Sequence, residues 1–386
     1  MPTPIVYHIS TFSPTRCGIA TYTEDVIDAL PNSTSRRVRM QYDTEETVPG
    51  FDLVIHMDKP ESYHAAAETI NASGAAVVSL QHEFGIYGGK DGIYIKYLLD
   101  NLTVPVVTTL HTVSEELYLY VQDLVEYIIR KSQAVVVLSD QTANYVSGRY
   151  DVARGKLFVI RHGVPVTPFE DPQSLPLRRK LDSPLVFFSM GHLRRSKGYH
   201  YALQALARMK PFVPDFKYII LGTYQEQSWD GAETRQELHQ LIETLELTDN
   251  VVWDERFLSI GEVIDHIKAS DIGLVTYTRP EQNSSGVLPL VLSCGRPVIA
   301  TSFDHALDLQ KLVGDCIAIA EINIVKSMLA SLLKWTAPGF DLHALMQASY
   351  DRTRCFTWDH AGNQYQQIFE QLLLQPAREL VSSDEE

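Results

Sequence analysis

The chain has 386 residues, 45% of them hydrophobic and 21% charged, and a formal net charge of −15. This length is enough for two or three domains of roughly 150 residues, each able to bury its own core. The acidic excess argues against a nucleic-acid partner and against docking on an anionic membrane, because both attract basic patches.

The cysteines and the N-terminus indicate a cytoplasmic protein. The four cysteines show no Cys-x-x-Cys spacing, so no zinc site is predicted and a reducing compartment fits. The N-terminus, MPTPIVYHISTFSP, lacks the basic segment and apolar core of a signal peptide. No apolar run reaches the roughly 20 residues that span a bilayer, so we expect no integral membrane segment. The oligomeric state stays open.

Short apolar runs alternate with helical patterns in the first 165 residues. Predicted strands cover residues 4–10, 52–57, 75–80, 105–110, 134–139 and 157–160. Such runs suit strands buried on both faces of a parallel sheet. Between 19 and 30, Tyr22, Val26, Ile27 and Leu30 share one helical face. The alternation predicts a Rossmann-like domain over residues 1–165.

A second domain of the same kind follows a proline-rich stretch. Residues 164–176 contain four prolines, and we expect a linker at 166–183. Predicted strands then cover 184–190, 216–221, 250–253, 271–277, 296–301 and 316–320, giving a domain over 184–356. The polar tail 376–386 is predicted to be disordered. Two such α/β domains face each other across a cleft, and ligands bind beyond the carboxyl ends of their strands.

Three loops of the first domain hold candidate site residues. Gly18 lies where a helix begins, so a ligand can approach its backbone and an anion is favoured there. His82 and Glu83 emerge at a strand end and could hydrogen-bond ligand hydroxyls, and His111 follows another strand and can donate to a substrate. A plain turn at Gly18, a surface loop at 82–92 and structural histidines remain the alternatives.

The loop 191–198 of the second domain is basic. Lys197 lies at the start of a predicted helix, where its ammonium could meet a phosphate, and Arg194 and Arg195 flank it. The alternative is a solvated basic turn.

The segment 279–301 is the most informative. Ser284, Ser285 and Gly286 precede an apolar helix of about two turns, in which Pro289 is tolerated because it falls in the first turn. The amides around Ser285–Val287 predict an anion pocket, and Glu281 could bond hydroxyls beside it. The alternative is an ordinary strand–turn–helix connection.

These five segments, in this order, resemble the family 4 retaining glycosyltransferases of the GT-B fold. The resemblance runs from CGIATYTEDV at 17–26 to CFTWDHAGNQYQQIFEQLL at 355–373, and PEQNSSG at 280–286 resembles a subgroup with the pattern PEQxxSG. It implies an acceptor-binding N-terminal domain, a donor-binding C-terminal domain, and a final helix at 357–375 that crosses back onto the N-terminal domain.

The resemblance assigns roles to the candidate residues. His111 matches the active-site histidine of the family, Lys197 matches its donor-phosphate lysine, and Gly18 would approach the donor phosphate. Together with the positions of these residues in the loops, the resemblance gives His111 and Glu281 as the expected catalytic residues. His82 and Glu83 are the expected acceptor-binding residues. The expected donor-binding residues are Gly18, Arg195, Lys197, Gln282, Ser285, Gly286 and Val287.

The sequence departs from the family pattern at two places. His192 stands where the family commonly has an arginine, so one cation is missing unless Arg194 or Arg195 replaces it. Leu290 stands where a glutamate usually contacts the nucleotide ribose. The first glutamate position of that pattern falls on Gln282, with Glu281 one residue earlier, and the sequence leaves open which of the two occupies the sugar site.

The expected function is retaining transfer of a sugar from a nucleotide-sugar donor to a hydroxyl of a glycan or small-molecule acceptor. Lys197 and the helix near 286 would stabilise the departing diphosphate, while His111 and Glu281 orient the sugar. No Asp-x-Asp pair occurs in the chain, so we expect no metal, and no other cofactor.

Other functions remain open. Loss of the ribose-binding glutamate would suit a glycoside phosphorylase that uses a sugar 1-phosphate. A sugar-nucleotide epimerase shares the architecture, and a non-catalytic relative would bind a glycan or nucleotide without transfer. A nicotinamide oxidoreductase is disfavoured because no Gly-x-Gly-x-x-Gly follows the first strand.

Overall fold

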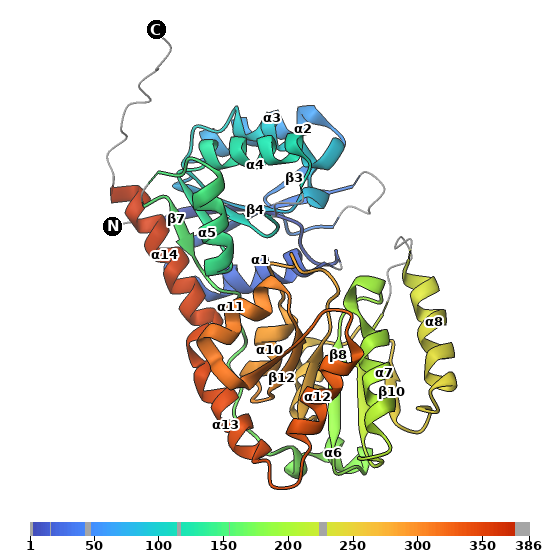
Figure 1. Ribbon diagram of the computed structural model, residues 1–386. Coiled ribbons are helices and arrows are strands. Elements are labelled where there is room, and N and C mark those ends of the chain that lie inside the picture. Colours follow the sequence, from blue (N-terminus) through green and yellow to red (C-terminus); the bar gives the residue numbers. More distant parts are fainter. Residues whose placement is uncertain are drawn as a thin grey trace. The chain divides into compact units, whose positions relative to one another are not determined.

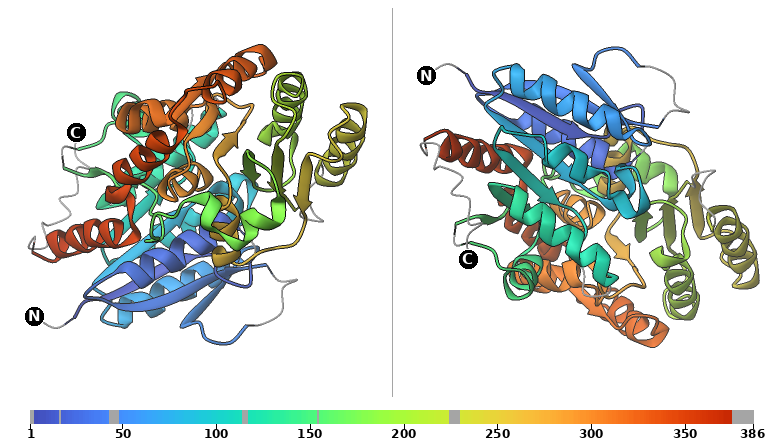
Figure 2. Two further views of the ribbon diagram at one scale, coloured as in Figure 1. Left: turned by 90° about the horizontal axis from the view of Figure 1, so that it is seen from below. Right: turned by 90° about the horizontal axis from the view of Figure 1, so that it is seen from above.

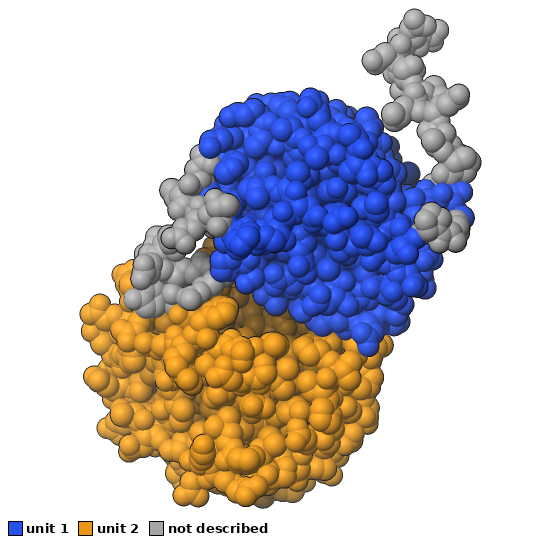
Figure 3. Space-filling view, turned by 180° about the vertical axis from the view of Figure 1, so that it is seen from behind, with its two compact units in different colours: residues 1–163, 358–386 blue, residues 164–357 orange. Residues whose placement is uncertain are grey.

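The computed structural model describes residues 3–15, 17–42, 48–113, 117–153, 155–223 and 230–374. The tail 376–386, predicted to be disordered, lies outside these residues. The chain divides into two compact units, which Figure 3 colours separately. Unit 1 contains residues 1–163 and 358–386, and unit 2 contains residues 164–357.

Unit 1 is built on a parallel sheet of seven strands in the order β3-β2-β1-β4-β5-β6-β7 (Figure 1). Its strands are β1 (Ile5–Ser10), β2 (Thr34–Gln41), β3 (Leu53–His56), β4 (Val77–His82), β5 (Val106–Leu110), β6 (Ala134–Val137) and β7 (Leu157–Val159). The order reverses between β1 and β4, so the loops after these two strands flank a topological switch point.

Helices cover both faces of this sheet (Figure 2). They are α1 (Gly18–Ala29), α2 (Pro60–Ala72), η1 (Phe84–Ile86), η2 (Lys90–Gly92), α3 (Ile95–Leu99), α4 (Leu119–Lys131), α5 (Asp140–Arg149) and α14 (Trp358–Leu374). One apolar cluster joins the sheet to α2, α3 and α4, and another joins its opposite face to α1 and α14.

Strand β2 is absent from the strands predicted above. It carries three arginines, and its first half is exposed, so it does not form an apolar run. Arg36 pairs with Asp52 at 3.1 Å. Arg39, which is only 1% exposed, places its guanidinium 5.3 Å from the ring centroid of Phe51. A charged side chain that folding buries against an aromatic ring gives no hydrophobic signal in the sequence.

The final helix, α14, packs against α1 within unit 1. The hydroxyl of Tyr365 lies 2.9 Å from that of Tyr22 and 2.7 Å from Oγ1 of Thr109. Gly362 allows close approach, because a Cβ there would lie 2.1 Å from the carbonyl oxygen of Ala29. A buried hydroxyl network and a backbone contact therefore fix this helix.

Tyr365→Phe is expected to lower the free energy of unfolding by about 2 kcal/mol, because two buried hydroxyls lose their shared partner. Urea denaturation followed by circular dichroism measures the change. Tyr118→Phe is the matched control, since Tyr118 is 75% exposed and its substitution is expected to change little. Equal stability of the two variants would mean that the network does not hold the helix.

Unit 2 is built on a second parallel sheet, with six strands in the order β10-β9-β8-β11-β12-β13. Its strands are β8 (Val186–Met190), β9 (Lys217–Leu221), β10 (Val251–Asp254), β11 (Ile272–Val275), β12 (Val298–Thr301) and β13 (Ile317–Ala320). The order reverses between β8 and β11. The two units are thus both Rossmann-like, as predicted.

The helices of unit 2 also lie on both faces of their sheet (Figure 1). They are η3 (Pro172–Ser174), α6 (Pro176–Leu181), η4 (Arg195–Lys197), α7 (Tyr199–Met209), α8 (Gly231–Thr244), α9 (Ile260–Lys268), α10 (Val287–Ser293), α11 (Asp304–Val313), η5 (Gly314–Cys316), α12 (Val325–Trp335), α13 (Leu342–Arg352) and η6 (Arg354–Phe356).

The stretch 166–183, predicted as a linker, is part of unit 2 and contains α6. Its Arg178 is only 2% exposed and pairs with Asp271 at 2.6 Å. The same carboxylate accepts a hydrogen bond from the backbone N–H of Val186 at 2.7 Å. An ion pair beside the first residues of β8 and β11 therefore fastens this stretch to the sheet.

Candidate functional site

The switch point of unit 2 brings together two of the loops predicted to carry chemistry. The loop 191–198 follows β8, and the loop 276–286 follows β11. Since β8 and β11 are parallel neighbours, their carboxyl ends meet at one edge of the sheet. Ligands of open α/β sheets bind at this position.

Gly198 holds the first of these loops against the second. Its φ is +68°, and a Cβ at this position would lie 1.9 Å from the carbonyl oxygen of Thr276. The hydroxyl of Thr276 in turn donates to the carbonyl oxygen of Lys197 at 2.8 Å. The backbone of Lys197 is therefore fixed beside the end of β11.

The ammonium of Lys197 lies 3.9 Å from the ring centroid of Tyr277. The side chain is half-buried, and none of the carboxylates that the structure describes forms an ion pair with it. A cation–π contact orients the ammonium without neutralising its charge. Lys197 thus keeps a positive charge available to an anionic ligand at the switch point.

His192 does not restore the charge of the family arginine. Burial, together with the positive charges of Arg194 and Lys197, lowers the pKa of its imidazole. The ring is therefore neutral at neutral pH. His192 therefore does not supply the positive charge that the family arginine would carry at this position.

The two arginines next to His192 differ in their partners. Arg195 pairs with Glu237 at 2.5 Å and with Glu233 at 3.2 Å, both on α8. Arg194 is exposed and has no ion pair among the described residues. The predicted donor-binding role of Arg195 stays a prediction, and Arg194 carries the uncommitted charge.

Glu281 and Gln282 also differ in the hydrogen bonds that they make within the protein. The side-chain amide of Gln282 donates to the backbone carbonyl oxygen of Ser284 at 2.8 Å, and the backbone carbonyl oxygen of Gln282 accepts from the backbone N–H of His305 at 3.1 Å. The half-buried Glu281 makes no hydrogen bond or ion pair with another described residue. Of the two, Glu281 has the carboxylate free to meet a ligand.

The predicted anion pocket at Ser285–Val287 lies at the start of a short helix. Helix α10 has seven residues, so its dipole is smaller than that of a long helix. The hydroxyl of Ser285 accepts from Leu288 N–H at 3.3 Å and lies 3.2 Å from that of Tyr277. Because this side chain is engaged within the protein, any anion contact would come from the amides of Gly286 and Val287. Leu290, on the same helix, is buried in the core.

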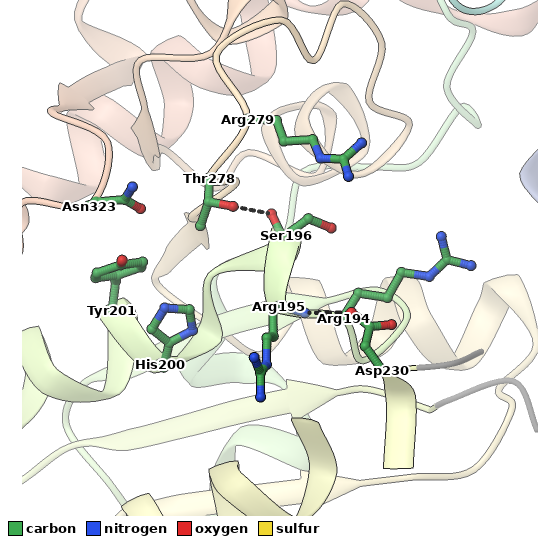
Figure 4. A pocket seen from close by; sticks show the side chains of 9 residues that line it. All are labelled: Arg194, Arg195, Ser196, His200, Tyr201, Asp230, Thr278, Arg279 and Asn323. Atoms are coloured by element: carbon green, nitrogen blue, oxygen red, sulfur yellow. Dashed lines mark hydrogen bonds between the residues drawn. The ribbon is translucent and has the colours of Figure 1, made fainter. Parts of the chain in front are cut away.

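A cavity of about 480 Å³ lies beside the loop 194–197, and three arginines line it (Figure 4). Sequence reasoning singled out Arg194 and Arg195 but not Arg279 or the cavity itself. The side chain of Arg195 turns away from those of Arg194 and Arg279. Asp230 also lines the cavity, and its carboxylate accepts from Arg195 N–H at 3.2 Å.

In unit 1, Gly18 is the first residue of α1, directly after the N-cap Cys17. The Sγ of Cys17 accepts from Ala20 N–H at 3.4 Å. A Cβ on Gly18 would meet nothing within 4 Å, so internal packing does not require a glycine here. The space above this backbone is open to a ligand, and the predicted role of Gly18 stays a prediction.

Of the two residues predicted to bind an acceptor, His82 is buried and Glu83 is half-buried. His82 stacks on Tyr87 with ring centroids 6.0 Å apart, and burial lowers its pKa to about 3. Glu83 accepts from the hydroxyl of Thr112 at 2.6 Å and from Phe84 N–H at 3.0 Å. Both side chains thus support the loop after β4 in this structure, and acceptor binding by them stays a prediction.

His111 follows β5 and is 6% exposed. Its Nε2 lies 2.8 Å from Oε1 of Gln81, and its ring meets that of Tyr22 edge-on at 4.8 Å. Burial, then the electrostatic interaction with His162 and His82, lowers the pKa of His111 to about 3. The ring is neutral at neutral pH, and its bond to Gln81 requires the proton on Nε2.

Comparisons with known proteins give two matches to family models. Residues 176–311 match the family model for glycosyl transferases group 1, and residues 91–167 match the model for glycosyltransferase family 4. The chain carries glycosyltransferase domains. The first match contains the loops on both sides of the switch point in unit 2, and the second contains His111.

Solved structures of the same architecture show that these glycosyltransferase domains have the GT-B fold. Sucrose-phosphate synthase from Thermosynechococcus elongatus is 17% identical with a TM-score of 0.74, covering 96% of this chain and 99% of that one. A glycosyltransferase from Rickettsia africae is 17% identical with a TM-score of 0.74, covering 97% and 100%. Anabaena HepE in complex with UDP is 15% identical with a TM-score of 0.74, covering 95% and 100%.

A search of curated protein sequences gave no significant match. Within the described ranges, no helix of these glycosyltransferase domains has the length and apolar character needed to cross a bilayer. The same residues contain no group of three or more His, Cys, Asp or Glu side chains that could hold a metal ion. Metal independence and a cytoplasmic location stay predictions.

Proposed function

We propose that the chain transfers a sugar from a nucleotide-sugar donor to a hydroxyl of a glycan or small-molecule acceptor, with retention of the anomeric configuration. The free ammonium of Lys197 at the switch point of a glycosyltransferase domain carries this proposal. Similar structures hold UDP and UDP-glucose, so uridine nucleotides are the first donors to test.

The chemical problem is to stabilise a departing diphosphate while positive charge builds on the sugar ring. Lys197 would stabilise the departing diphosphate, because its ammonium is a point charge that the protein has not neutralised. The amides of Gly286 and Val287 add a smaller contribution, because α10 is short. Gln282 and Arg195 have internal partners, so we assign them a supporting role in donor binding.

Glu281 would stabilise the positive charge that builds on the sugar ring, and the neutral His111 would serve as a hydrogen-bonding group. Glu281 has an uncommitted carboxylate that can accept from sugar hydroxyls and favour developing positive charge. We assign none of these side chains the role of a nucleophile. We therefore propose that the leaving phosphate helps to take the proton of the acceptor hydroxyl, and that no metal is needed.

Lys197→Ala is expected to weaken UDP binding about tenfold, because a charge-assisted contact to phosphate is lost. Isothermal titration calorimetry with UDP measures the affinity. Turnover of UDP-glucose is expected to fall with it, and proton NMR of the product reports the anomeric configuration. Lys311→Ala is the matched control, since Lys311 is exposed in the last turn of α11.

Equal affinity of Lys197→Ala, Lys311→Ala and the unsubstituted chain for UDP would remove Lys197 from the donor site. An inverted product would refute retention while leaving donor binding intact. Nucleotide binding without transfer to any acceptor would favour a non-catalytic relative.

A glycoside phosphorylase is the second candidate, because one observation favours it. Leu290 is buried in the core of unit 2, so the position expected to contact a nucleotide ribose offers no carboxylate. Phosphate-dependent cleavage of an oligosaccharide without any nucleotide would establish this function in place of transfer.

A further inference from the structure

We propose that the cavity beside the loop 194–197 is a second anion site, which binds a phosphate group separately from Lys197. The proposal goes beyond the transfer reaction and does not depend on it. The cavity has a volume of about 480 Å³, ample for a phosphate and a sugar attached to it. Figure 4 shows it between the start of α7, the first residues of the loop after β11, and the turn before α12.

Two uncommitted guanidinium groups give the cavity its charge. Arg194 and Arg279 are both exposed, and neither forms an ion pair or hydrogen bond through its side chain with another described residue. They come from the loops after β8 and β11, and their guanidinium groups extend to the same side of the cavity in Figure 4. Two free arginines in one cavity stand out on a chain whose net charge is −15.

Among the described residues that line the cavity, the other charged groups are already paired. Arg195 is neutralised by Glu233 and Glu237. The carboxylate of Asp230 is 6% exposed and accepts from the backbone N–H of Arg195. The charge left for a ligand is therefore that of Arg194 and Arg279, and paired guanidinium groups match a phosphate dianion through bidentate hydrogen bonds.

Uncharged polar groups complete the wall. Asn323, whose φ is +61°, presents its side chain from the turn before α12, and Tyr201 and His200 present theirs from the first turn of α7. Burial lowers the pKa of His200, so its ring is neutral and offers one N–H at neutral pH. These groups can bond phosphate oxygens or the hydroxyls of an attached sugar.

The cavity is distinct from the donor position. Neither Lys197 nor Tyr277 lines it, although Lys197 belongs to the same loop and its ammonium lies over Tyr277. Helix α10, whose first amides belong to the donor site, contributes no lining residue either. A phosphate in this cavity and a diphosphate at Lys197 would therefore contact different side chains.

The test measures phosphate binding to the full chain by calorimetry, with and without saturating UDP. The probes are inorganic phosphate, glucose 6-phosphate and uncharged glucose. We expect a phosphate probe to bind in both conditions, and Arg194→Ala/Arg279→Ala to weaken it about tenfold. Arg130→Ala/Arg208→Ala removes the same charge at exposed positions away from the cavity, and it should leave binding unchanged, as should Lys197→Ala.

Tighter binding of glucose 6-phosphate than of inorganic phosphate would identify a phosphorylated sugar as the ligand, and the reverse would identify free phosphate. The proposal fails if neither phosphate binds, if UDP displaces the phosphate, or if Lys197→Ala abolishes its binding. It also fails if the two double variants bind phosphate equally. Arg194→Lys/Arg279→Lys keeps the charges and should retain part of the affinity, and urea midpoints show that each variant is folded. Absence of UDP binding would count against the donor site only.

Discussion

Gly198→Ala is expected to lower the free energy of unfolding by about 3 kcal/mol and to weaken UDP binding more than tenfold. An alanine at φ +68° costs about 1 kcal/mol in backbone strain. Its Cβ would also lie 1.9 Å from the carbonyl oxygen of Thr276, and relieving such an overlap costs about 1–3 kcal/mol. Moving the loop away from β11 would also move the ammonium of Lys197.

Urea denaturation and UDP calorimetry on the same protein separate the two effects. Gly261→Ala is the matched control, because a Cβ at this helical position meets nothing within 4 Å, and alanine there should stabilise slightly. If Gly198→Ala kept full stability and full UDP affinity, the contact between this loop and β11 would not position Lys197.

Acidification below pH 6 is expected to lower the free energy of unfolding, by roughly 1.4 kcal/mol per pH unit for each proton that the unfolded chain binds in excess of the folded one. Four histidines of unit 1, three of them buried and one half-buried, have a lowered pKa, so the unfolded chain takes up protons that the folded chain excludes. They are His8, His82, His111 and His162. Two carboxyl groups with a raised pKa, Asp25 and Glu83, act in the opposite direction. The histidines outnumber these carboxyl groups, so the net effect of acid on unit 1 is destabilising.

The direction of the histidine pKa shifts decides whether acid raises or lowers the free energy of unfolding. Only well above a pH of about 6.5, the ordinary pKa of histidine, are these histidines neutral in both states and without effect on the pH dependence. As the pH falls toward the folded value of about 3 for His82, the unfolded state gains protons and stability is lost. Free energies of unfolding measured in urea at several pH values between 7 and 4.5 give the slope.

His82→Phe should flatten this slope by about 1.4 kcal/mol per pH unit, since one titrating group is removed from a fully buried position. His360→Gln is the control, because His360 is exposed on α14, and it should leave the slope unchanged. An unchanged slope in His82→Phe would mean that His82 takes up its proton in the folded state.

The strands of both sheets are recognisable in the sequence, except for β2. Buried parallel strands are continuous apolar runs, and twelve of the thirteen strands lie within or close to such runs. Strand β2 is a strand because β1 and β3 pair with it on either side, although its own residues include Arg36, Arg37 and Arg39. Pairing between segments distant in sequence overrides the local pattern.

The backbone positions of the candidate site were more predictable than its side-chain partners. The loops after β8 and β11 meet because the strand order requires it, and the sequence places Lys197 and Glu281 on them. The partners Glu233 and Glu237 of Arg195 come from α8, far along the chain, so the sequence could not distinguish Arg195 from Arg194. His82 ends β4, which is buried along its whole length, so its inward position follows from the place of that strand in the sheet.

The division of unit 1 between two segments has a consequence for the way the protein is made. The first 163 residues leave the ribosome long before α14, which unit 1 needs to cover Tyr22 and Val26. Unit 2, a single uninterrupted segment, is synthesised in full during that interval. The nascent first unit therefore keeps an apolar face uncovered until α14 has been synthesised.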